Sequence, residues 1–178
     1  QDLYHANGDK YRWTTPKRVI QGGAVHIRHF FGFGGHLNTS RKDKNVAWAN
    51  TYIYSPKEQE VGAWIGFNTL STSDYRAGVP KQGDWSSNPL CKIWLNDKEI
   101  LPPKWKGDRK TGKEDPITNQ IYTSREPTTI TLKKGWNKVL IKSTPTWKWV
   151  FSFSPVMKDG NSYREVPGLR YSVTLPKQ

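Results

Sequence analysis

The sequence has very little cysteine: Cys91 is the only one among 178 residues. This excludes a disulfide-rich scaffold and a zinc site built from several cysteines. Long hydrophobic runs are missing too, since no stretch approaches the ~18 consecutive apolar residues of a membrane-spanning helix. Residues 1–13 are polar, so we expect no signal peptide within this sequence. Acidic residues are scarce, with 15 Asp and Glu against 28 Lys and Arg, and the formal net charge is +13.

The chain is nevertheless rich in aromatic residues, with 9 Trp, 8 Tyr and 6 Phe. Disordered chains lack such residues, so the composition predicts a folded protein. The positive charge raises the question of a nucleic-acid partner. It is spread along the sequence, and its densest part, 104–114, has five basic and two acidic residues. We interpret that part as a solvated loop, with a contact for an anionic ligand as the alternative, and expect no nucleic-acid partner.

Short runs of β-branched and aromatic residues, separated by 15 Gly and 12 Pro, replace any helical periodicity. Many of these runs alternate between apolar and other residues, which is typical of strands. Asn96-Asp97 is expected to form a two-residue turn, and 133–135 to close a hairpin with Gly135 at a positive φ. The predicted strands are 24–31, 47–54, 61–67, 92–95, 98–101, 128–132, 136–142, 148–153 and 169–175.

This pattern predicts an all-β fold, an antiparallel two-sheet β-sandwich or jelly roll. We expect one domain over 1–178, with an irregular N-terminal segment (1–22) and two long loops (68–89 and 102–127). The residues that alternate toward one side of separate strands form the predicted core. They are Val61, Ala63, Ile65, Phe67, Ile93, Leu95, Val139 and Ile141.

Four motifs occur in an order that resembles a known domain type: 61–67 (VGAWIGF), 92–100 (KIWLNDKEI), 130–142 (ITLKKGWNKVLIK) and 147–153 (WKWVFSF). Together they resemble the galactose-binding-like jelly-roll domains attached to glycoside hydrolases of gut Bacteroidetes. The nearest likeness is the C-terminal accessory domain of family 20 β-N-acetylhexosaminidases. The similarity covers roughly 46–171. The family often has Asn-Gly where this chain has Asn96-Asp97, a change compatible with the fold because Asp also tolerates positive φ.

The resemblance implies a secreted, periplasmic or cell-surface protein that acts on glycans. Its partners would be a glycan, neutral or anionic, and the catalytic domain of a parent enzyme. In domains of this type the residues of these motifs build the scaffold, so the motifs do not specify the ligand. Some domains of this type only pack against the enzyme that they accompany.

No catalytic motif is recognisable, whether His-Glu-x-x-His, Gly-x-Ser-x-Gly or a phosphate-binding loop. We interpret Cys91 as a small buried hydrophobe. His26 and His29 fall on opposite sides of a predicted strand, so no metal site is predicted. Asp74 and Asp84, in one long loop, are the best pair of carboxylates for a glycosidase, although loop aspartates usually form turns. We therefore expect no catalysis by the domain itself and no cofactor.

The loop 71–88 is the first candidate for a ligand-binding surface. Sugars bind to an aromatic ring that covers their apolar face and to polar side chains that bond their hydroxyl groups. Trp85 could instead anchor the loop onto the core. The predicted binding residues of the loop are Asp74, Tyr75, Arg76, Gln82, Asp84 and Trp85.

Trp64 is the second candidate, because Gly62 and Gly66 flank it on the same side of a predicted strand. The indole could lie open to a ligand, or a loop such as 102–127 could fill the space. The sequence thus predicts a non-catalytic carbohydrate-binding or accessory module of a glycan-degrading enzyme. The alternatives are a hydrolase that uses loop carboxylates and, third, a polyanion-binding β-domain.

Overall fold

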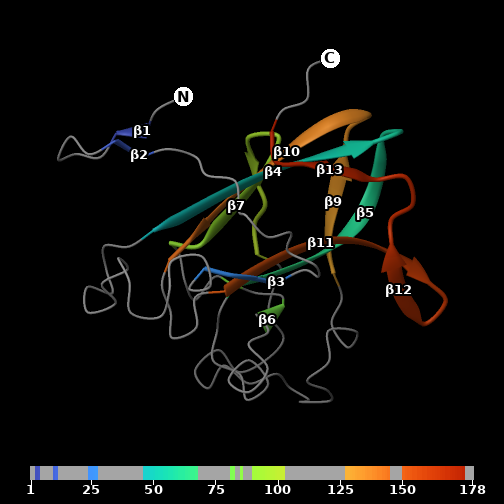
Figure 1. The fold of residues 1–178 in the computed structure, drawn as a ribbon. Helices are drawn as coiled ribbons and strands as arrows, with labels where there is room; N and C mark the ends of the chain where they lie inside the picture. Colours follow the sequence, from blue (N-terminus) through green and yellow to red (C-terminus); the bar gives the residue numbers. More distant parts are fainter. Residues whose placement is uncertain are drawn as a thin grey trace.

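The computed structural model describes residues 3–4, 10–11, 24–27, 46–67, 81–82, 85, 90–102, 127–144 and 150–174. These residues form strands and turns, and none of them is helical. Accordingly, no helix that could cross a membrane occurs among them. The strands form two antiparallel sheets that face each other (Figure 1), which confirms the prediction of an all-β sandwich.

The first sheet has five strands in the order β13-β4-β10-β7-β8. The long strands β4 and β10 are paired over their whole length, from Gly135 opposite Ser55 to Ser143 opposite Ala47. The bounds are Ala47–Ser55 for β4, Lys92–Leu95 for β7, Lys98–Glu99 for β8, Gly135–Ser143 for β10 and Arg170–Ser172 for β13.

The second sheet is built around β5 (Gln59–Phe67) and β11 (Val150–Asp159), which pair with each other. The outer edge of β11 pairs with β3 (Ala24–His26) and β12 (Ser162–Glu165). The outer edge of β5 pairs with β9 and β6. These last strands are Thr128–Leu132 and Lys81–Gln82, and a separate pair consists of β1 (Leu3–Tyr4) and β2 (Lys10–Tyr11).

The core lies between the two sheets and follows the period-2 alternation of the strands. All eight residues predicted to form it are buried, which confirms that part of the prediction. Their burial removes apolar surface from water and is the main force that holds the sheets together. Further buried members are Ile27, Ile53, Trp85, Cys91, Ile130, Leu132, Phe151 and Val166.

The two-residue turn between β7 and β8 is confirmed. Asn96 and Asp97 have φ of 51° and 66°, and Leu95 pairs with Lys98 across the turn. Positive φ at both central residues is the requirement of a type I′ hairpin, which Asn and Asp tolerate better than other residues with a side chain.

The predicted hairpin over 128–142 is wrong, although both of its strands exist. β9 pairs with β5 in one sheet, whereas β10 pairs with β4 and β7 in the other. The connection at Lys133-Lys134 therefore crosses between the sheets, and Gly135 at φ 96° begins β10. Alternation identifies each strand but not its partner, and Leu132 and Val139 reach the same core from opposite sides.

The connection from β4 to β5, at 56–58, crosses between the sheets at the same end as 133–134. Ser55 Oγ accepts a hydrogen bond from Gln59 Nε2 at 2.9 Å and donates one to the carbonyl of Lys57 at 2.6 Å. Two stacked crossovers thus fix how far apart the sheets lie at this end.

The remaining strand predictions differ in extent. The strand predicted at 148–153 continues to Asp159 and turns at Gly160, which has φ of 59°, into β12, a strand that the sequence did not indicate. Of the strand predicted at 169–175, the structure forms Arg170–Ser172. Most residues of the predicted irregular segments lie outside the described part of the chain. The described residues of these segments include the short strands β1, β2 and β6.

Candidate functional site

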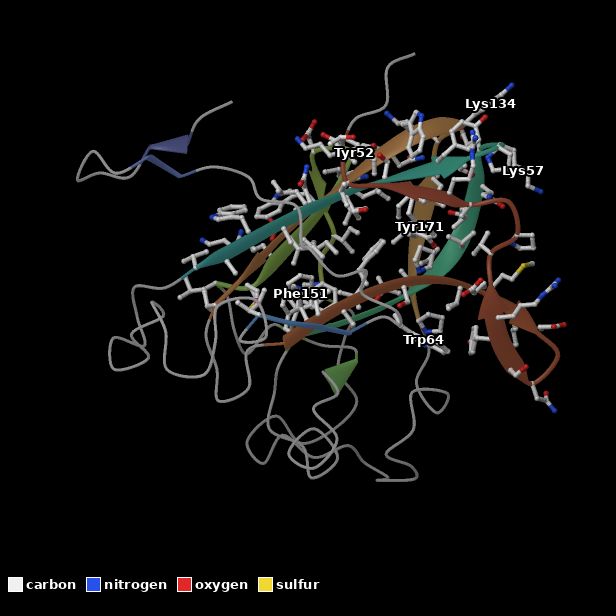
Figure 2. The ribbon with its side chains drawn as sticks, viewed as in Figure 1. Tyr52, Lys57, Trp64, Lys134, Phe151 and Tyr171 are labelled. Carbon is white, nitrogen blue, oxygen red and sulfur yellow. The ribbon has the colours of Figure 1, made fainter. Side chains whose placement is uncertain are left out.

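The outward side of the five-stranded sheet carries aromatic residues where a solvent-facing sheet usually carries polar ones. On β4 these residues alternate with buried Ile53 and Ser55. Figure 2 shows Tyr52 on the outer side of β4, away from Phe151 between the sheets. We call the outward residues of this sheet the aromatic face: Trp48, Asn50, Tyr52, Tyr54, Lys92, Trp94, Glu99, Trp136, Lys138, Leu140, Lys142, Arg170 and Ser172.

The strand register arranges these residues in rows across the sheet. Trp48 is opposite Lys142, which is opposite Lys92. Two residues along, Asn50 is opposite Leu140, which is opposite Trp94. The next row joins Ser172, Tyr52 and Lys138, and the last joins Arg170, Tyr54 and Trp136. Every row therefore contains an aromatic side chain and three of the four contain a cation, over about 20 Å from the first row to the last.

At one end of the face lies the tryptophan cluster, which consists of Trp48, Trp94 and Lys142. The two indoles stack, with ring centroids 5.8 Å apart and an angle of 19° between their planes. Lys142 Nζ lies 5.7 Å from the centroid of the Trp48 ring, within the range of a cation–π contact. Trp48 is still 46% exposed. A stacked but exposed indole of this kind can contact a further ligand.

At the other end lies the tyrosine cluster, which consists of Tyr54, Trp136 and Arg170. The Arg170 guanidinium carbon is 4.1 Å from the centroid of the Tyr54 ring. Trp136 meets the same tyrosine edge to face, with centroids 5.4 Å apart. Stacking on the ring holds the guanidinium group at the surface, where its remaining N–H donors can bind an anion.

Two other lysines of the face are paired with carboxylates at its edge. Lys92 Nζ lies 3.1 Å from Glu99 Oε2, and Lys138 Nζ lies 3.0 Å from Asp97 Oδ1. Both acids belong to the β7–β8 hairpin, so the described carboxylates lie along one side of the face. Exposed pairs such as these contribute little to stability, but they orient both lysines.

The face combines what sugar recognition requires. Indole and phenol rings can cover the apolar C–H side of a pyranose, and amide, hydroxyl and ammonium groups can bond its hydroxyls. Isolated exposed hydrophobic residues need no explanation, but a contiguous aromatic surface usually marks an interaction site.

Among the described residues, no group of His, Cys, Asp and Glu is arranged to hold a metal ion.

The structure places Trp85 in the core. Its side chain is 4% exposed and lies 5.8 Å from the ring of Phe67, at an angle of 57°. The indole therefore anchors its segment to the second sheet. This agrees with the alternative interpretation, in which Trp85 holds the loop onto the core. In this arrangement its ring faces are covered by protein.

Trp64 lies on the opposite outer side of the sandwich from Tyr52 (Figure 2). It is half-buried and meets Tyr163 of β12 edge to face, with centroids 5.5 Å apart. The space beside Gly62 is filled by Pro127, whose Cγ lies 2.6 Å from where a Cβ on this glycine would be. Pro127 is the last residue of the predicted loop 102–127, so at this position the loop occupies the space.

The other predicted binding residues are not brought together by the described part of the chain. Gln82 belongs to β6, where its backbone pairs with Gly66. Asp74, Tyr75, Arg76 and Asp84 lie outside the described residues. Binding by the loop 71–88 stays a prediction.

The aromatic face was missed because its residues come from strands far apart in the sequence. Trp136 is half-buried on the outer side of β10 beside Tyr54, although it is not near Tyr54 in the sequence. One sequence pattern did point to the face, since the outward positions of β4 are aromatic at Trp48, Tyr52 and Tyr54. Only the register shows that Trp94 and Trp136 join them.

Cys91 directly precedes β7 and is buried, as predicted, and its Sγ lies 3.5 Å from Thr144 Oγ1. Burial raises the pKa of the thiol above its ordinary value of 9.0. A neutral, buried thiol is a packing residue and a poor nucleophile.

Comparisons of the chain with protein-family models, with curated proteins and with solved structures gave no match. The chemistry of the candidate site therefore rests on its own residues.

Proposed function

We propose that this domain is a non-catalytic carbohydrate-binding or accessory module of a secreted or periplasmic glycan-degrading enzyme, and that it binds glycan on the aromatic face. The observation that carries the proposal is the exposed indole of Trp48, stacked on Trp94 on the outside of the five-stranded sheet.

The physical argument starts from the cost of exposing this surface. The transfer of a large aromatic side chain out of water lowers the free energy. The core of this domain buries such side chains, among them Phe67 and Trp85. The tryptophan and tyrosine clusters instead lie at the surface, in contact with cations. A ligand that covers the rings recovers that free energy, and a pyranose offers the matching apolar side.

The carboxylates of the face favour binding over hydrolysis. A glycosidase places two carboxyl groups on either side of the scissile bond, about 5–9.5 Å apart. Glu99 and Asp97 are each bonded to a lysine and lie on one hairpin at the edge of the face. We therefore assign the face a binding role and leave hydrolysis to a parent catalytic domain.

The test is a glycan-array screen of the purified domain, followed by calorimetry on the glycans that bind. A few stacking contacts and hydrogen bonds, less the cost of association, give an expected Kd of roughly 10 µM to 1 mM. Trp48→Ala should weaken binding about five-fold or more, because one aromatic contact contributes on the order of 1 kcal/mol. Trp94→Ala should act in the same direction.

Two matched variants locate the site. Trp64→Ala removes an indole from the opposite side of the sandwich, and Tyr75→Ala removes a ring from the loop 71–88. Both should bind as the unmodified protein does, with thermal unfolding as the check that each variant is folded. Loss of binding in Tyr75→Ala alone would move the site to the loop. The absence of binding to any glycan would contradict the carbohydrate-binding role.

A further inference from the structure

Among the strand residues that the structure describes, charge is distributed unequally between the two sheets. The strands of the five-stranded sheet contain five basic residues, Lys92, Lys98, Lys138, Lys142 and Arg170, against one acidic residue, Glu99. The strands of the second sheet are balanced, with Lys81, Lys158 and Arg164 against Glu60, Asp159 and Glu165. The aromatic face therefore lies on the positive sheet.

From this asymmetry we infer that the aromatic face binds an acidic polysaccharide, one whose sugar rings carry carboxylate or sulfate groups. The inference rests on the proposed function and specifies its ligand. A neutral glycan requires stacking rings and hydroxyl partners but no excess of cations. An anionic glycan gains from cations that stand next to the stacking rings.

Lys142 and Arg170 are the cations that meet this requirement. Within the described residues neither has a carboxylate at ion-pair distance, and each lies over an aromatic ring. Each cluster thus pairs an aromatic ring with a cation that no carboxylate of the described strands and turns neutralises. The Arg170 guanidinium group also has the planar donor geometry that suits a carboxylate or a sulfate.

The spacing of the two clusters favours an extended ligand. They lie at opposite ends of β4, six residues and therefore about 20 Å apart. Asn50 and Tyr52 occupy the outward positions between them. A polysaccharide chain laid along β4 would contact one cluster, then these polar groups, then the second cluster, so affinity should rise with chain length.

Single-stranded nucleic acid is the competing polyanion. Its binding draws mainly on many phosphate contacts along a basic groove. Lys92 and Lys138 are engaged with Glu99 and Asp97, and the two remaining cations stand at opposite ends of the face. Two cations that are separated by polar and aromatic groups suit a sugar polymer better than a nucleic acid.

The first experiment compares two forms of one polysaccharide, one charged and one neutral. Affinity is measured for polygalacturonate and for its methyl-esterified form, in which the rings are unchanged but the carboxylates are neutralised. The acidic panel is extended with alginate, hyaluronan, chondroitin sulfate and heparin, which distinguish carboxylate from sulfate groups. The uncharged polymers are galactan and xylan. The nucleic acid is poly(dT). We expect an acidic glycan to bind more tightly than every neutral one, and its affinity to fall as salt rises, because salt screens surface charges.

The protein variants test the two cations directly. The double variant Lys142→Gln with Arg170→Gln should lower affinity for the acidic glycan about ten-fold and flatten its salt dependence. Lys158→Gln, which removes one exposed lysine from the second sheet, is the control and should change neither. Trp48→Ala should weaken binding to charged and neutral glycans alike.

The outcomes separate this inference from the proposed function. If neutral glycans bind as tightly as acidic ones, or if the double variant binds like the control, the inference is overturned while the carbohydrate-binding role stands. If poly(dT) binds more tightly than every acidic glycan, the ligand class is wrong. If no glycan binds, both fail.

Discussion

The side-chain amide of Asn96 donates a 2.8 Å hydrogen bond to Oδ1 of Asn137, 41 residues further along the chain. Asn96 lies in the β7–β8 turn, and Asn137 is completely buried in β10. Asn137 Oδ1 also accepts the backbone N–H of Lys133, at 2.9 Å. Its Nδ2 faces the carbonyl oxygens of Ile53, Lys133 and Gly135, at 2.8–3.3 Å. One amide thus joins β4, the crossover at 133–134 and the β7–β8 hairpin.

Asn137→Ala should lower the free energy of unfolding by about 3 kcal/mol, because it leaves buried backbone groups without hydrogen-bond partners. The measurement is equilibrium denaturation in urea. Asn161→Ala, at an exposed turn position, is the matched control and should change stability by less than about 0.5 kcal/mol. Equal stability of the two variants would show that the buried amide is not the hub described above.

The turn at Asn96-Asp97 predicts opposite effects for two substitutions of Asp97. Both remove the exposed ion pair with Lys138, so they differ only in the backbone. Asp97→Gly should raise the free energy of unfolding by about 0.5–1 kcal/mol, because glycine adopts φ of 66° without strain. Asp97→Ala should lower it by about 1 kcal/mol. Thermal unfolding of both variants would reveal the difference, and a result of the same sign for both would contradict it.

The contact between Gly62 and Pro127 predicts a coupled pair of substitutions. A Cβ at Gly62 would lie 2.6 and 2.9 Å from the Pro127 ring and 3.3 Å from Val156 Cγ2. Gly62→Ala should therefore destabilise the domain by about 1–3 kcal/mol. Much of that cost should disappear when Pro127→Ala is also present. A double-mutant cycle measures the coupling, and strictly additive effects would mean that the two residues do not touch.

Burial of Cys91 predicts how the thiol behaves with pH. Because its pKa is raised above 9.0 in the folded protein, the thiol of the unfolded chain ionises first. The stability gained by keeping the thiol neutral is fully present well below the ordinary pKa of 9.0 and is lost as pH rises through the higher pKa of the folded protein. The unmodified protein should therefore lose more stability between neutral and alkaline pH than Cys91→Ala does. Alkylation of Cys91 should also follow the rate of unfolding; rapid labelling of the folded protein would contradict its burial.

The sequence alone determined the long strands, the predicted core residues and one turn. In β5 the apolar residues Val61, Ala63, Ile65 and Phe67 alternate with Gly62 and Trp64. This alternation shows which side of the strand is buried, and it requires no knowledge of the neighbouring strands. Asn96-Asp97 could be predicted because the conformation of a two-residue turn depends on the residues within it.

Pairing and the candidate site were decided by the tertiary structure. Leu132 and Trp136 are four residues apart and were predicted to share a hairpin, yet their strands belong to different sheets. Trp48, Trp94 and Trp136 form one face only because β10 lies between β4 and β7. Alternation fixes the side on which a residue lies within its own strand. Which strands then become neighbours depends on contacts between residues distant in sequence, above all the buried amide of Asn137 and the core that both sheets share.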